Sequence, residues 1–338
     1  MTRHGVLTGG TWCHDRNLMV DVWPAEDGRA DVIAEESGGG GSACNLAVGI
    51  RTLDPALPVA TMGLIGDDAD GRFLLAFADR HGIDRTRLAV TREAATDYTL
   101  AFSTQSSGRR THISAFGTSG LLTPEHFNFT QVTHRIFHLG LPGVHRIMDA
   151  PWQGEANGWV DTLKRARAAG LQTNLELVSI APEANAALVR PCLPHLDLLV
   201  VNDHEIAGIA GIPTVQAGRT DVAACIAAAI AALAAGAMQV VAVHFPRGGV
   251  VVTRDGGLFV RGSVRVPQAQ IAGANGAGDA FAAGFVYGMH ERWPIEQALA
   301  LGHAAAAASL RRLSTTDGLE PWRECLHLAA SWGWHEDP

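Results

Sequence analysis

The sequence predicts an α/β fold in which a central, mostly parallel twisted sheet is flanked by helices and a small β-sheet lies over one edge as a lid. From residue 135 onward, short apolar segments alternate with helical segments, and wholly apolar strands are typical of a parallel sheet covered on both faces. The segments 18–36 and 98–116 break this alternation. They are half polar, as strands with one face in water are, so we assign them to the lid.

The first half of the chain supplies strands to both sheets. The runs at 5–10 and 58–66 are short and apolar, and we expect both to be buried strands. A glycine loop leads into a helix within 37–53, and 68–83 has the periodicity of an amphipathic helix. The expected lid strands, the last two paired as a hairpin around Gln-Ser-Ser-Gly, are 18–23, 30–36, 98–104 and 109–116.

The second half of the chain supplies the rest of the central sheet and its helices. We treat residues 1–338 as one domain, with lid segments at approximately 13–37 and 96–117 inserted within it. The apolar or amphipathic patterns of this half predict strands at 135–140, 171–177, 196–202 and 238–245 and helices at 161–170 and 222–235.

Composition limits the classes of protein that this chain can represent. Its 338 residues are 47% apolar and 18% charged, which is typical of a folded protein with a large core. The net charge of −8 and the absence of a basic run argue against a nucleic-acid or membrane-surface partner. The five cysteines are odd in number and lack Cys-x-x-Cys spacing, so we expect a reduced, cytoplasmic protein without a zinc site.

Residues 273–285, GANGAGDAFAAGF, place a carboxylate where a glycine-rich turn becomes a helix. The N–H groups that open a helix have no partner within it, and together with the helix dipole they form an anion site. Gly276, Ala277 and Gly278 are small enough for an anion to approach that backbone. Asp279 follows in the first turn, where the dipole favours the ionised carboxylate. An anion site beside an ionised base is what phosphoryl transfer needs.

Taken alone, this stretch leaves two interpretations open. An Asp in the first turn after glycines is also a common helix start that has no function. Other nucleotide motifs fit less well, because the chain has no Gly-x4-Gly-Lys-Ser/Thr string and Phe281 stands where a dinucleotide fingerprint needs its third glycine. Further motifs must therefore decide between a helix start and a reaction site.

Polar groups also follow the expected strands near the N-terminus. Asp15 lies five residues after Gly10, and a carboxylate at the carboxyl end of a parallel strand can accept two ligand hydroxyls. Gly40, Gly41 and Asn45 belong to a glycine loop whose N–H groups and amide suit a sugar, which both donates and accepts hydrogen bonds. Each group has a plainer explanation: a solvated loop Asp, and a structural loop in which Asn45 caps the helix.

Asn202 and Glu205 follow the apolar strand expected at 196–202 and lie three residues apart. Oxygen ligands of this kind suit hydrated Mg²⁺, which keeps most of its waters and is held through one or two carboxylates and phosphate. A helix cap with a first-turn Glu explains the same pattern. The 15 histidines show no metal-ligand spacing, and we expect most of them on the surface.

In this order, the motifs resemble those of the ribokinase-like (PfkB) carbohydrate kinase family, and the likeness covers nearly the whole chain. The family's Asp after the first strand resembles Asp15, and its Gly-Gly-x-x-x-Asn loop resembles 40–45. Its G-x-D-x-x-G stretch resembles 65–71, its Asn-x-x-Glu resembles 202–205, and its Gly-Ala-Gly-Asp signature resembles 276–279.

The resemblance implies transfer of the ATP γ-phosphate to a hydroxymethyl group of a sugar or sugar derivative. It implies that Asp279 is the general base and that the amides of Gly276, Ala277 and Gly278 form the anion hole. It further implies that the lid forms the contact of a homodimer. By the same resemblance, Asp15, Gly40, Gly41 and Asn45 bind the sugar, and Asn202, Glu205 and Gly248 bind ATP, the first two holding Mg²⁺ through water.

Several positions depart from the family pattern. Gly273 and Ala274 replace the usual Asp-Thr, and the Asp is a ligand of a monovalent-cation site, so we expect little dependence on K⁺. Of the family's Thr-x-Gly-x-x-Gly turn, 243–248 keeps only the last glycine. The family's D-x-N-x-R stretch resembles 173–176, and a Gly-Ala-Asn stretch of the lid resembles 116–119.

Two alternative functions stay open: a nucleoside kinase of the same fold and a non-catalytic sugar-binding relative. Trp12 and Phe116 could stack on a base, although packing explains each as well. Arg109 and Arg110 could bind an anionic substrate, although a solvated face explains both.

Overall fold

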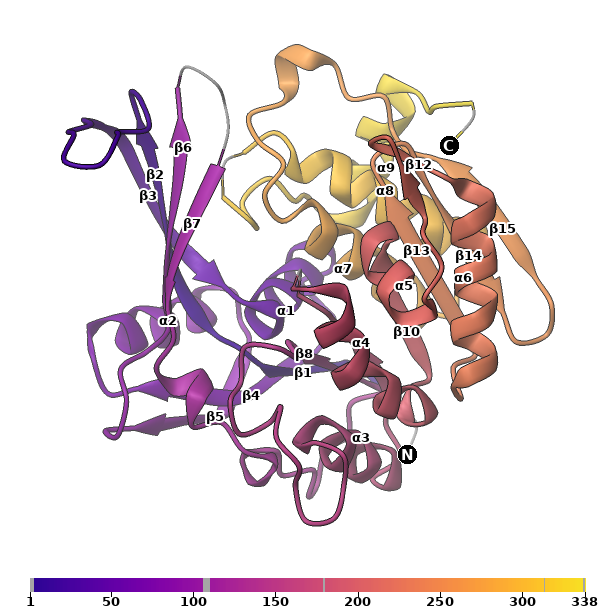
Figure 1. Cartoon of the computed structure of the whole chain (residues 1–338), viewed down its shortest axis with the longest axis horizontal. Coiled ribbons are helices and arrows are strands. Elements are labelled where there is room, and N and C mark those ends of the chain that lie inside the picture. The colour runs from indigo at the N-terminus through magenta and orange to yellow at the C-terminus, as the bar shows by residue number, and fades with distance from the viewer. Residues whose placement is uncertain (1–2, 106–109, 179, 313, 337) are drawn as a thin grey trace.

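The computed structural model shows one large sheet with helices on both faces and a small sheet that projects from it (Figure 1). It describes residues 3–105, 110–178, 180–312, 314–336 and 338. Of the two arginines considered for binding an anionic substrate, Arg109 lies outside the described residues, and so does the side chain of Arg110. No described helix is long and apolar enough to cross a membrane.

The large sheet has the strand order β15-β14-β13-β10-β9-β8-β1-β4-β5. Seven neighbouring strands run parallel, and the β13–β14–β15 meander adds two antiparallel strands at one edge. The expected mostly parallel sheet is therefore confirmed. Its strands are β1 (Val6–Gly10), β4 (Val59–Gly66), β5 (Asp84–Thr91), β8 (Ile136–Gly140), β9 (Gln172–Leu175), β10 (Leu198–Asn202), β13 (Val240–Phe245), β14 (Gly248–Thr253) and β15 (Leu258–Gly262).

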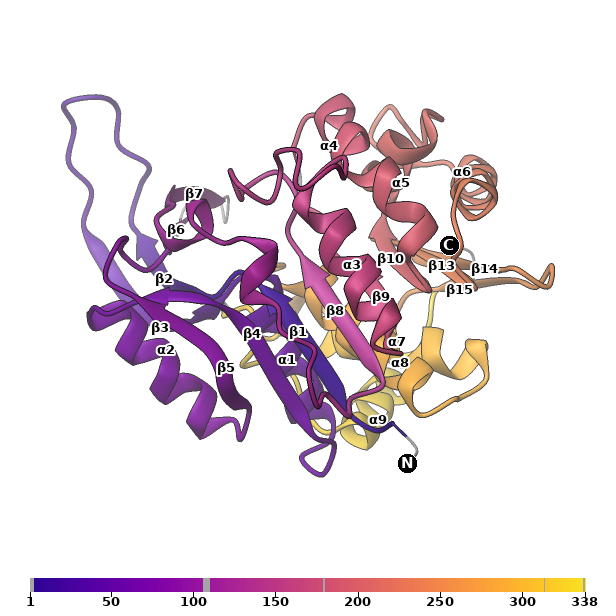
Figure 2. The same ribbon diagram turned by 90° about the horizontal axis from the view of Figure 1, so that it is seen from below.

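Helices cover the two faces of this sheet as separate layers (Figure 2). One apolar core lies between the sheet and α1, α2, α7, α8 and α9, and a second lies between the sheet and α3, α5 and α6. The helices are α1 (Ser42–Leu53), α2 (Ala69–Arg80), α3 (Gly158–Ala168), α4 (Pro182–Val189), α5 (Asp203–Ala210), α6 (Val222–Ala235), α7 (Ala277–His290), α8 (Ile295–Ser309) and α9 (Trp322–Trp332).

The small sheet has the order β3-β2-β6-β7 and contains the expected lid segments. β6 and β7 pair antiparallel, as the hairpin prediction required, and β2 pairs parallel with β6. The expected bounds of the first two strands were wrong. The strands are β2 (Cys13–Val20), β3 (Val32–Gly40), β6 (Tyr98–Thr104) and β7 (Arg110–Ala115), and β11 (Val215–Gln216) with β12 (Arg219–Thr220) forms a separate ribbon.

Residues 37–40, expected as a glycine loop, form the last part of β3. Gly38, Gly39 and Gly40 pair with Asp15, His14 and Cys13 across the antiparallel ladder. A strand can accept glycines where a neighbour approaches its backbone closely. Here that neighbour is the Asp15 carboxylate, against which a Cβ at residue 40 would collide.

Five of the 15 histidines are buried, although we expected most of them on the surface. A buried neutral imidazole can satisfy one donor and one acceptor in the core, which a sequence pattern does not reveal. The buried histidines are His14, His138, His145, His290 and His303.

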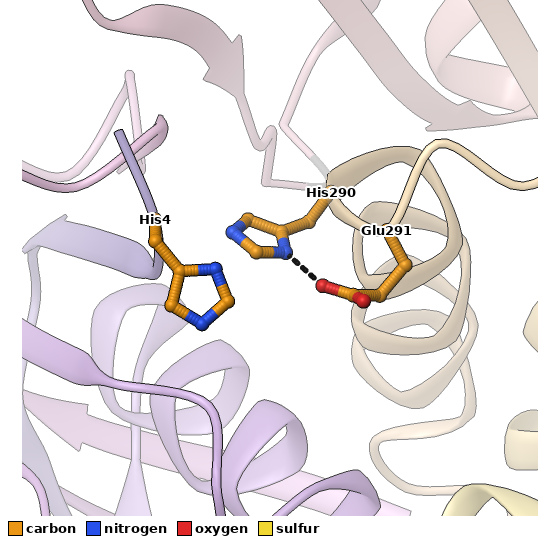
Figure 3. Close-up of side chains that lie close together, drawn as sticks. All are labelled: His4, His290 and Glu291. Atoms are coloured by element: carbon orange, nitrogen blue, oxygen red, sulfur yellow. Dashed lines mark hydrogen bonds and ion pairs between the residues drawn. The ribbon is translucent and has the colours of Figure 1, made fainter. Parts of the chain in front are cut away.

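His4, His290 and Glu291 cluster where the N-terminal segment meets the end of α7 (Figure 3). The Nδ1 atom of His290 lies 2.7 Å from Glu291 Oε1, and its Nε2 atom accepts a hydrogen bond of 2.8 Å from the N–H of Gly5. Both ring nitrogens of His290 are therefore in use. The cluster tethers the N-terminal segment to α7 and offers a metal ion no free imidazole nitrogen at His290.

Candidate active site

Two adjacent cavities lie at the carboxyl ends of the parallel strands and meet at the start of α7. The first, of about 490 Å³, lies under the small sheet; we call it the carboxylate cavity because it is lined by Asp15, Asp97, Glu176, Glu205 and Asp279. The second, of about 430 Å³, is the apolar cavity, lined in part by Val264, Phe281, Ala306, Ala307 and Leu310. Asn202, His244 and Gly278 line both cavities.

The turn that begins α7 separates the cavities. Gly276 precedes the helix with φ of 73°, a left-handed conformation that glycine adopts without strain. No side chain caps this helix start, so the first N–H groups of α7 have no side-chain acceptor. Ala277 lines the apolar cavity, and Gly278 lines both. The start of α7 thus presents its positive end at the boundary between the cavities.

Asp279 lies in the first turn of α7 and lines the carboxylate cavity. The side chain of Asn45, from α1, hydrogen-bonds to its carboxyl group. The helix dipole led us to expect an ionised carboxylate. Instead, burial and the neighbouring carboxyl of Glu176 raise the pKa of Asp279 well above its ordinary value, because each disfavours a second negative charge there.

Asp15 lies in β2 and lines the same cavity. Its Oδ1 atom is 3.2 Å from Cys13 Sγ, and its carboxyl also accepts a hydrogen bond from Thr315. Burial raises the pKa of Asp15 to about 6. Gly40 leaves room for this carboxylate without lining a cavity itself, whereas Gly41 lines the carboxylate cavity directly in front of α1.

Asn202 and Glu205 form a reciprocal cap at the start of α5. Asn202 Oδ1 accepts the N–H of Glu205, and Glu205 Oε2 accepts the N–H of Asn202, both at 2.9 Å. The helix cap that the sequence left open as an explanation is therefore present. Both side chains also line the carboxylate cavity, and burial raises the pKa of Glu205 to about 7.

Gly248 is not brought to either cavity by the structure. It begins β14 and pairs with Phe245 at the tip of the β13–β14 hairpin. A Cβ at this position would collide with Pro338. The glycine therefore permits close packing of Pro338 and lines neither cavity, and its assignment to ATP binding stays a prediction.

Glu176 and His138 are site residues that the motif analysis did not identify. Glu176 follows the last residue of β9, and its carboxyl lies within hydrogen-bonding distance of the Asp279 carboxyl. His138, in β8, places Nε2 at 2.7 Å from Glu176 Oε2. The available signal was positional: like Asn202, Glu176 stands at the carboxyl end of a predicted parallel strand.

Of the two aromatic residues considered for base stacking, the structure places Phe116 at the carboxylate cavity and Trp12 in the core. Trp12 is buried, and its Nε1–H donates to Thr61 Oγ1 at 2.8 Å, so it belongs to the core. Phe116 lines the carboxylate cavity and is 61% exposed. No lysine or arginine is among the described residues that line this cavity.

Comparison with known proteins adds to this geometry. The sequence profile described as "pfkB family carbohydrate kinase" matches residues 16–323. The chain belongs to the pfkB family of carbohydrate kinases. The expected family and the expected enzyme class are thereby confirmed.

Individual relatives of this kinase differ in how much of the chain they match. The 5-dehydro-2-deoxygluconokinase of Geobacillus kaustophilus is 39% identical to this chain over 80 residues. That match covers 24% of this chain and only 23% of the relative. The ATP-dependent ribose-1-phosphate kinase of Halopiger xanaduensis is 24% identical over 311 residues, 91% of this chain and 92% of the relative. The fold is similar to that of Arabidopsis thaliana ribokinase complexed with ribose and ATP, with a TM-score of 0.76 and a sequence identity of 19%. The superposition covers 97% of this chain and 99% of the ribokinase chain. This similarity confirms the ribokinase-like fold.

Proposed function

We propose that this kinase transfers the γ-phosphate of ATP to a hydroxymethyl group of a sugar or sugar derivative, with Asp279 as the general base. The observation that carries the proposal is the position of Asp279. It lies where an uncapped helix start separates the apolar cavity from the carboxylate cavity. At this boundary a phosphate held by the helix N–H groups can meet a hydroxyl held beside a carboxylate.

The apolar cavity suits the nucleotide. Phe281 and the aliphatic residues of α8 offer a purine ring an apolar slot, and pockets of this kind bind ring systems with few polar groups. The triphosphate would extend from this slot to the N–H groups of Ala277 and Gly278, where the helix start favours negative charge. ATP is the donor that fits this arrangement, as it is the nucleotide bound in the similar Arabidopsis thaliana ribokinase structure.

Asn202 and Glu205 fit Mg²⁺ held through water. The reciprocal cap occupies Glu205 Oε2, which leaves Glu205 Oε1 to accept hydrogen bonds from metal-bound water. Mg²⁺ usually keeps several waters, so one carboxylate oxygen and the nucleotide phosphates are sufficient to hold it. When bound, the ion would neutralise charge on the transferring phosphate.

The carboxylate cavity suits a polyhydroxylated acceptor without negative charge. Asp15 and Asn45 offer the acceptors and donors that sugar hydroxyls require. An anionic acceptor would face several carboxyls with no lysine or arginine among the described lining residues. We therefore propose a neutral acceptor, and the earlier idea of an anionic substrate receives no support from the described residues.

In the proposed step, Asp279 takes the proton of the acceptor hydroxymethyl group. The acceptor oxygen forms a bond to the γ-phosphorus as the bond from that phosphorus to the leaving ADP oxygen breaks. The Ala277 and Gly278 N–H groups stabilise the phosphate during transfer, because they are fixed donors at a helix start. The small sheet covers this cavity through Tyr98, Thr99 and Ser114 and would limit access of competing water.

ATP consumption over a panel of acceptors tests the proposed function. The panel comprises D-ribose, D-fructose, D-gluconate, adenosine and inosine, each with Mg·ATP. We expect turnover of a neutral sugar. Faster turnover of a nucleoside would favour the nucleoside kinase, for which the exposed Phe116 at the cavity offers a stacking surface. Acceptor binding without ATP consumption would identify a non-catalytic sugar-binding protein.

We predict that activity depends little on K⁺. The N–H groups of Ala272 and Gly273 both donate to the carbonyl of Leu310, at 2.8 and 3.2 Å, so protein contacts hold the loop at the position of the missing aspartate. Asp317, which could have replaced that aspartate, is exposed and hydrogen-bonds with Glu36. Adding K⁺ over the millimolar range to a tetramethylammonium buffer at constant ionic strength should change turnover by less than about twofold. Activation of many-fold would show that a cation site persists without its aspartate.

We also predict a homodimer that forms through the small sheet. Exposed apolar side chains lie on this sheet and on the loop between β2 and β3, and exposed apolar surface of this kind marks interaction sites. Ile33→Asp should convert the dimer to a monomer in sedimentation experiments, whereas Val260→Asp, at an equally exposed site on β15, should leave it intact. A wild-type monomer would contradict this prediction. The exposed apolar side chains on these elements are Val22, Trp23, Val32, Ile33 and Ile113.

A further inference from the structure

The proposed reaction assigns no role to two of the carboxyls described in the carboxylate cavity, Asp97 and Glu176. Asp279 is assigned to proton transfer, Asp15 to the acceptor and Glu205 to the metal. Asp97 is held by the backbone, because its Oδ1 accepts N–H groups of the turn at 117–119. Glu176 is also the residue at the end of the stretch that departs from the family's D-x-N-x-R pattern.

Three elements fix the Glu176 carboxyl beside the proposed base. The N–H of Glu176 donates to the carbonyl of Leu139 at 2.8 Å, which continues the β8–β9 ladder and sets the direction of its side chain. Ser42, at the start of α1, hydrogen-bonds to the same carboxyl. The Asp279 carboxyl approaches from α7 within hydrogen-bonding distance. Two other carboxyls act on the pKa of Glu176: Asp279, which hydrogen-bonds to it, and Glu205 of α5, through its charge.

His138 acts on Glu176 as a neutral donor. Its Nδ1 lies 2.8 Å from the amide nitrogen of Asn174, so Nδ1 accepts and the ring proton resides on Nε2. That N–H points to Glu176 Oε2 at 2.7 Å. Burial lowers the pKa of His138 to about 3, which keeps the ring neutral. One oxygen of Glu176 is thus occupied by His138.

Two carboxyls at hydrogen-bonding distance share one proton, since ionising both would place two like charges side by side in a buried site. The location of that proton decides whether the base can work. A proton on Asp279 blocks its action as a base, whereas a proton on Glu176 leaves Asp279 ionised. When an acceptor hydroxyl and the Asn45 amide both donate to Asp279, its ionised form gains hydrogen bonds, and the shared proton shifts to Glu176.

We propose that Glu176 is the positioning residue of the base: in the working enzyme it holds the shared proton and donates it to Asp279 as a hydrogen bond. This inference rests on the proposed function, in which Asp279 is the base. The proton count balances at each stage. One proton moves from Asp279 to Glu176, Asp279 then takes the proton of the acceptor hydroxyl as its oxygen bonds to phosphorus, and the pair returns one proton to water after product leaves.

Substitution of Glu176 separates this role from a role in binding the acceptor. Glutamine reproduces the protonated carboxyl, because its oxygen accepts from His138 and its N–H₂ donates to Asp279. Glu176→Gln should therefore keep kcat within about threefold of wild type, far from the ~10²–10⁴-fold loss typical of removing a general base. Glu176→Ala removes the donor and leaves Asp279 poorly held, which should lower kcat on the order of 10²-fold.

The pH profile of kcat gives a readout that a structural role would not change. In wild type, loss of the shared proton at alkaline pH removes the hydrogen bond to Asp279, so kcat should fall there. Glutamine has no proton to lose, so the alkaline fall should be absent in Glu176→Gln, while the acid fall caused by protonation of Asp279 remains. Both pH limits belong to the coupled pair and not to one residue alone.

The deciding experiment measures kcat, acceptor KM and the pH profile of wild type, Glu176→Gln and Glu176→Ala with whichever panel acceptor wild type phosphorylates fastest. Infrared spectroscopy of the carboxylic-acid C=O band at neutral pH is a second readout that needs no acceptor. Glu176→Gln should lose the part of the band that comes from the shared proton and keep the part that comes from other buried carboxyls such as Glu205. Three results for Glu176→Gln would overturn the inference. They are a loss of kcat as large as that of Asp279→Asn, a change in acceptor KM alone, and an alkaline fall in kcat that persists. Wild type inactive on every acceptor would instead show that the proposed function, and the inference with it, is wrong.

Discussion

Replacing Asp279 with asparagine is expected to lower kcat by about 10²–10⁴-fold, the usual effect of removing a general base. Asparagine keeps the shape of the side chain and its contact with Asn45, but it cannot take the hydroxyl proton. Acceptor and ATP binding should therefore change little. Steady-state kinetics together with calorimetric binding of the acceptor separates the two effects.

Asp161→Asn is a matched control for this experiment. Asp161 also lies in the first turn of a helix, α3, but it lines neither cavity and forms an ion pair with Arg165 on the surface of the helix. Its substitution should leave kcat unchanged. Wild-type turnover by Asp279→Asn would show that another group accepts the proton.

Replacing Asp15 with alanine is expected to raise the acceptor KM by about 10- to 100-fold. A hydrogen bond to a charged group contributes about 1.5–3 kcal/mol, and each 1.4 kcal/mol corresponds to tenfold in affinity. The KM for ATP should stay within about twofold, because Asp15 does not line the apolar cavity. Equal effects on both KM values would place Asp15 outside the acceptor site.

The same carboxyl predicts a pH dependence of acceptor binding. Burial raises the pKa of Asp15 to about 6, so the carboxylate that accepts sugar hydroxyls is lost as the pH falls through that value. Acceptor affinity measured by calorimetry should weaken below about pH 6. Asp15→Asn should bind weakly with little change over the same range, which assigns the effect to this residue.

Much of the fold could be predicted from the chain because its signals are local. An apolar run such as 58–66 has to be buried, and its length and flanking residues identify it as the strand β4. The start of α7 was equally clear, since three small residues before Asp279 leave an uncapped helix end. By contrast, β5 is half polar and lies at a sheet edge, so its pattern did not distinguish it from a loop.

The parts of the site that escaped prediction depend on contacts between distant segments. Glu176 and His138 come from two different strands, and their proximity to Asp279 follows from the order of β8 and β9 in the sheet and from the packing of α7. No spacing in the sequence encodes that arrangement. The ionisation of Asp279 was misjudged for the same reason, because the dipole of its own helix was visible whereas the neighbouring carboxyl was not.

The most direct test of the central claim follows the phosphoryl group itself. Wild type is incubated with Mg·ATP labelled with ¹⁸O in the γ-phosphate and with each panel acceptor, and the products are analysed by mass spectrometry. The proposal predicts label in a phosphate ester at the acceptor's hydroxymethyl group, and loss of that product in Asp279→Asn. Label found only in inorganic phosphate, or an ester formed as fast by Asp279→Asn as by wild type, would contradict it.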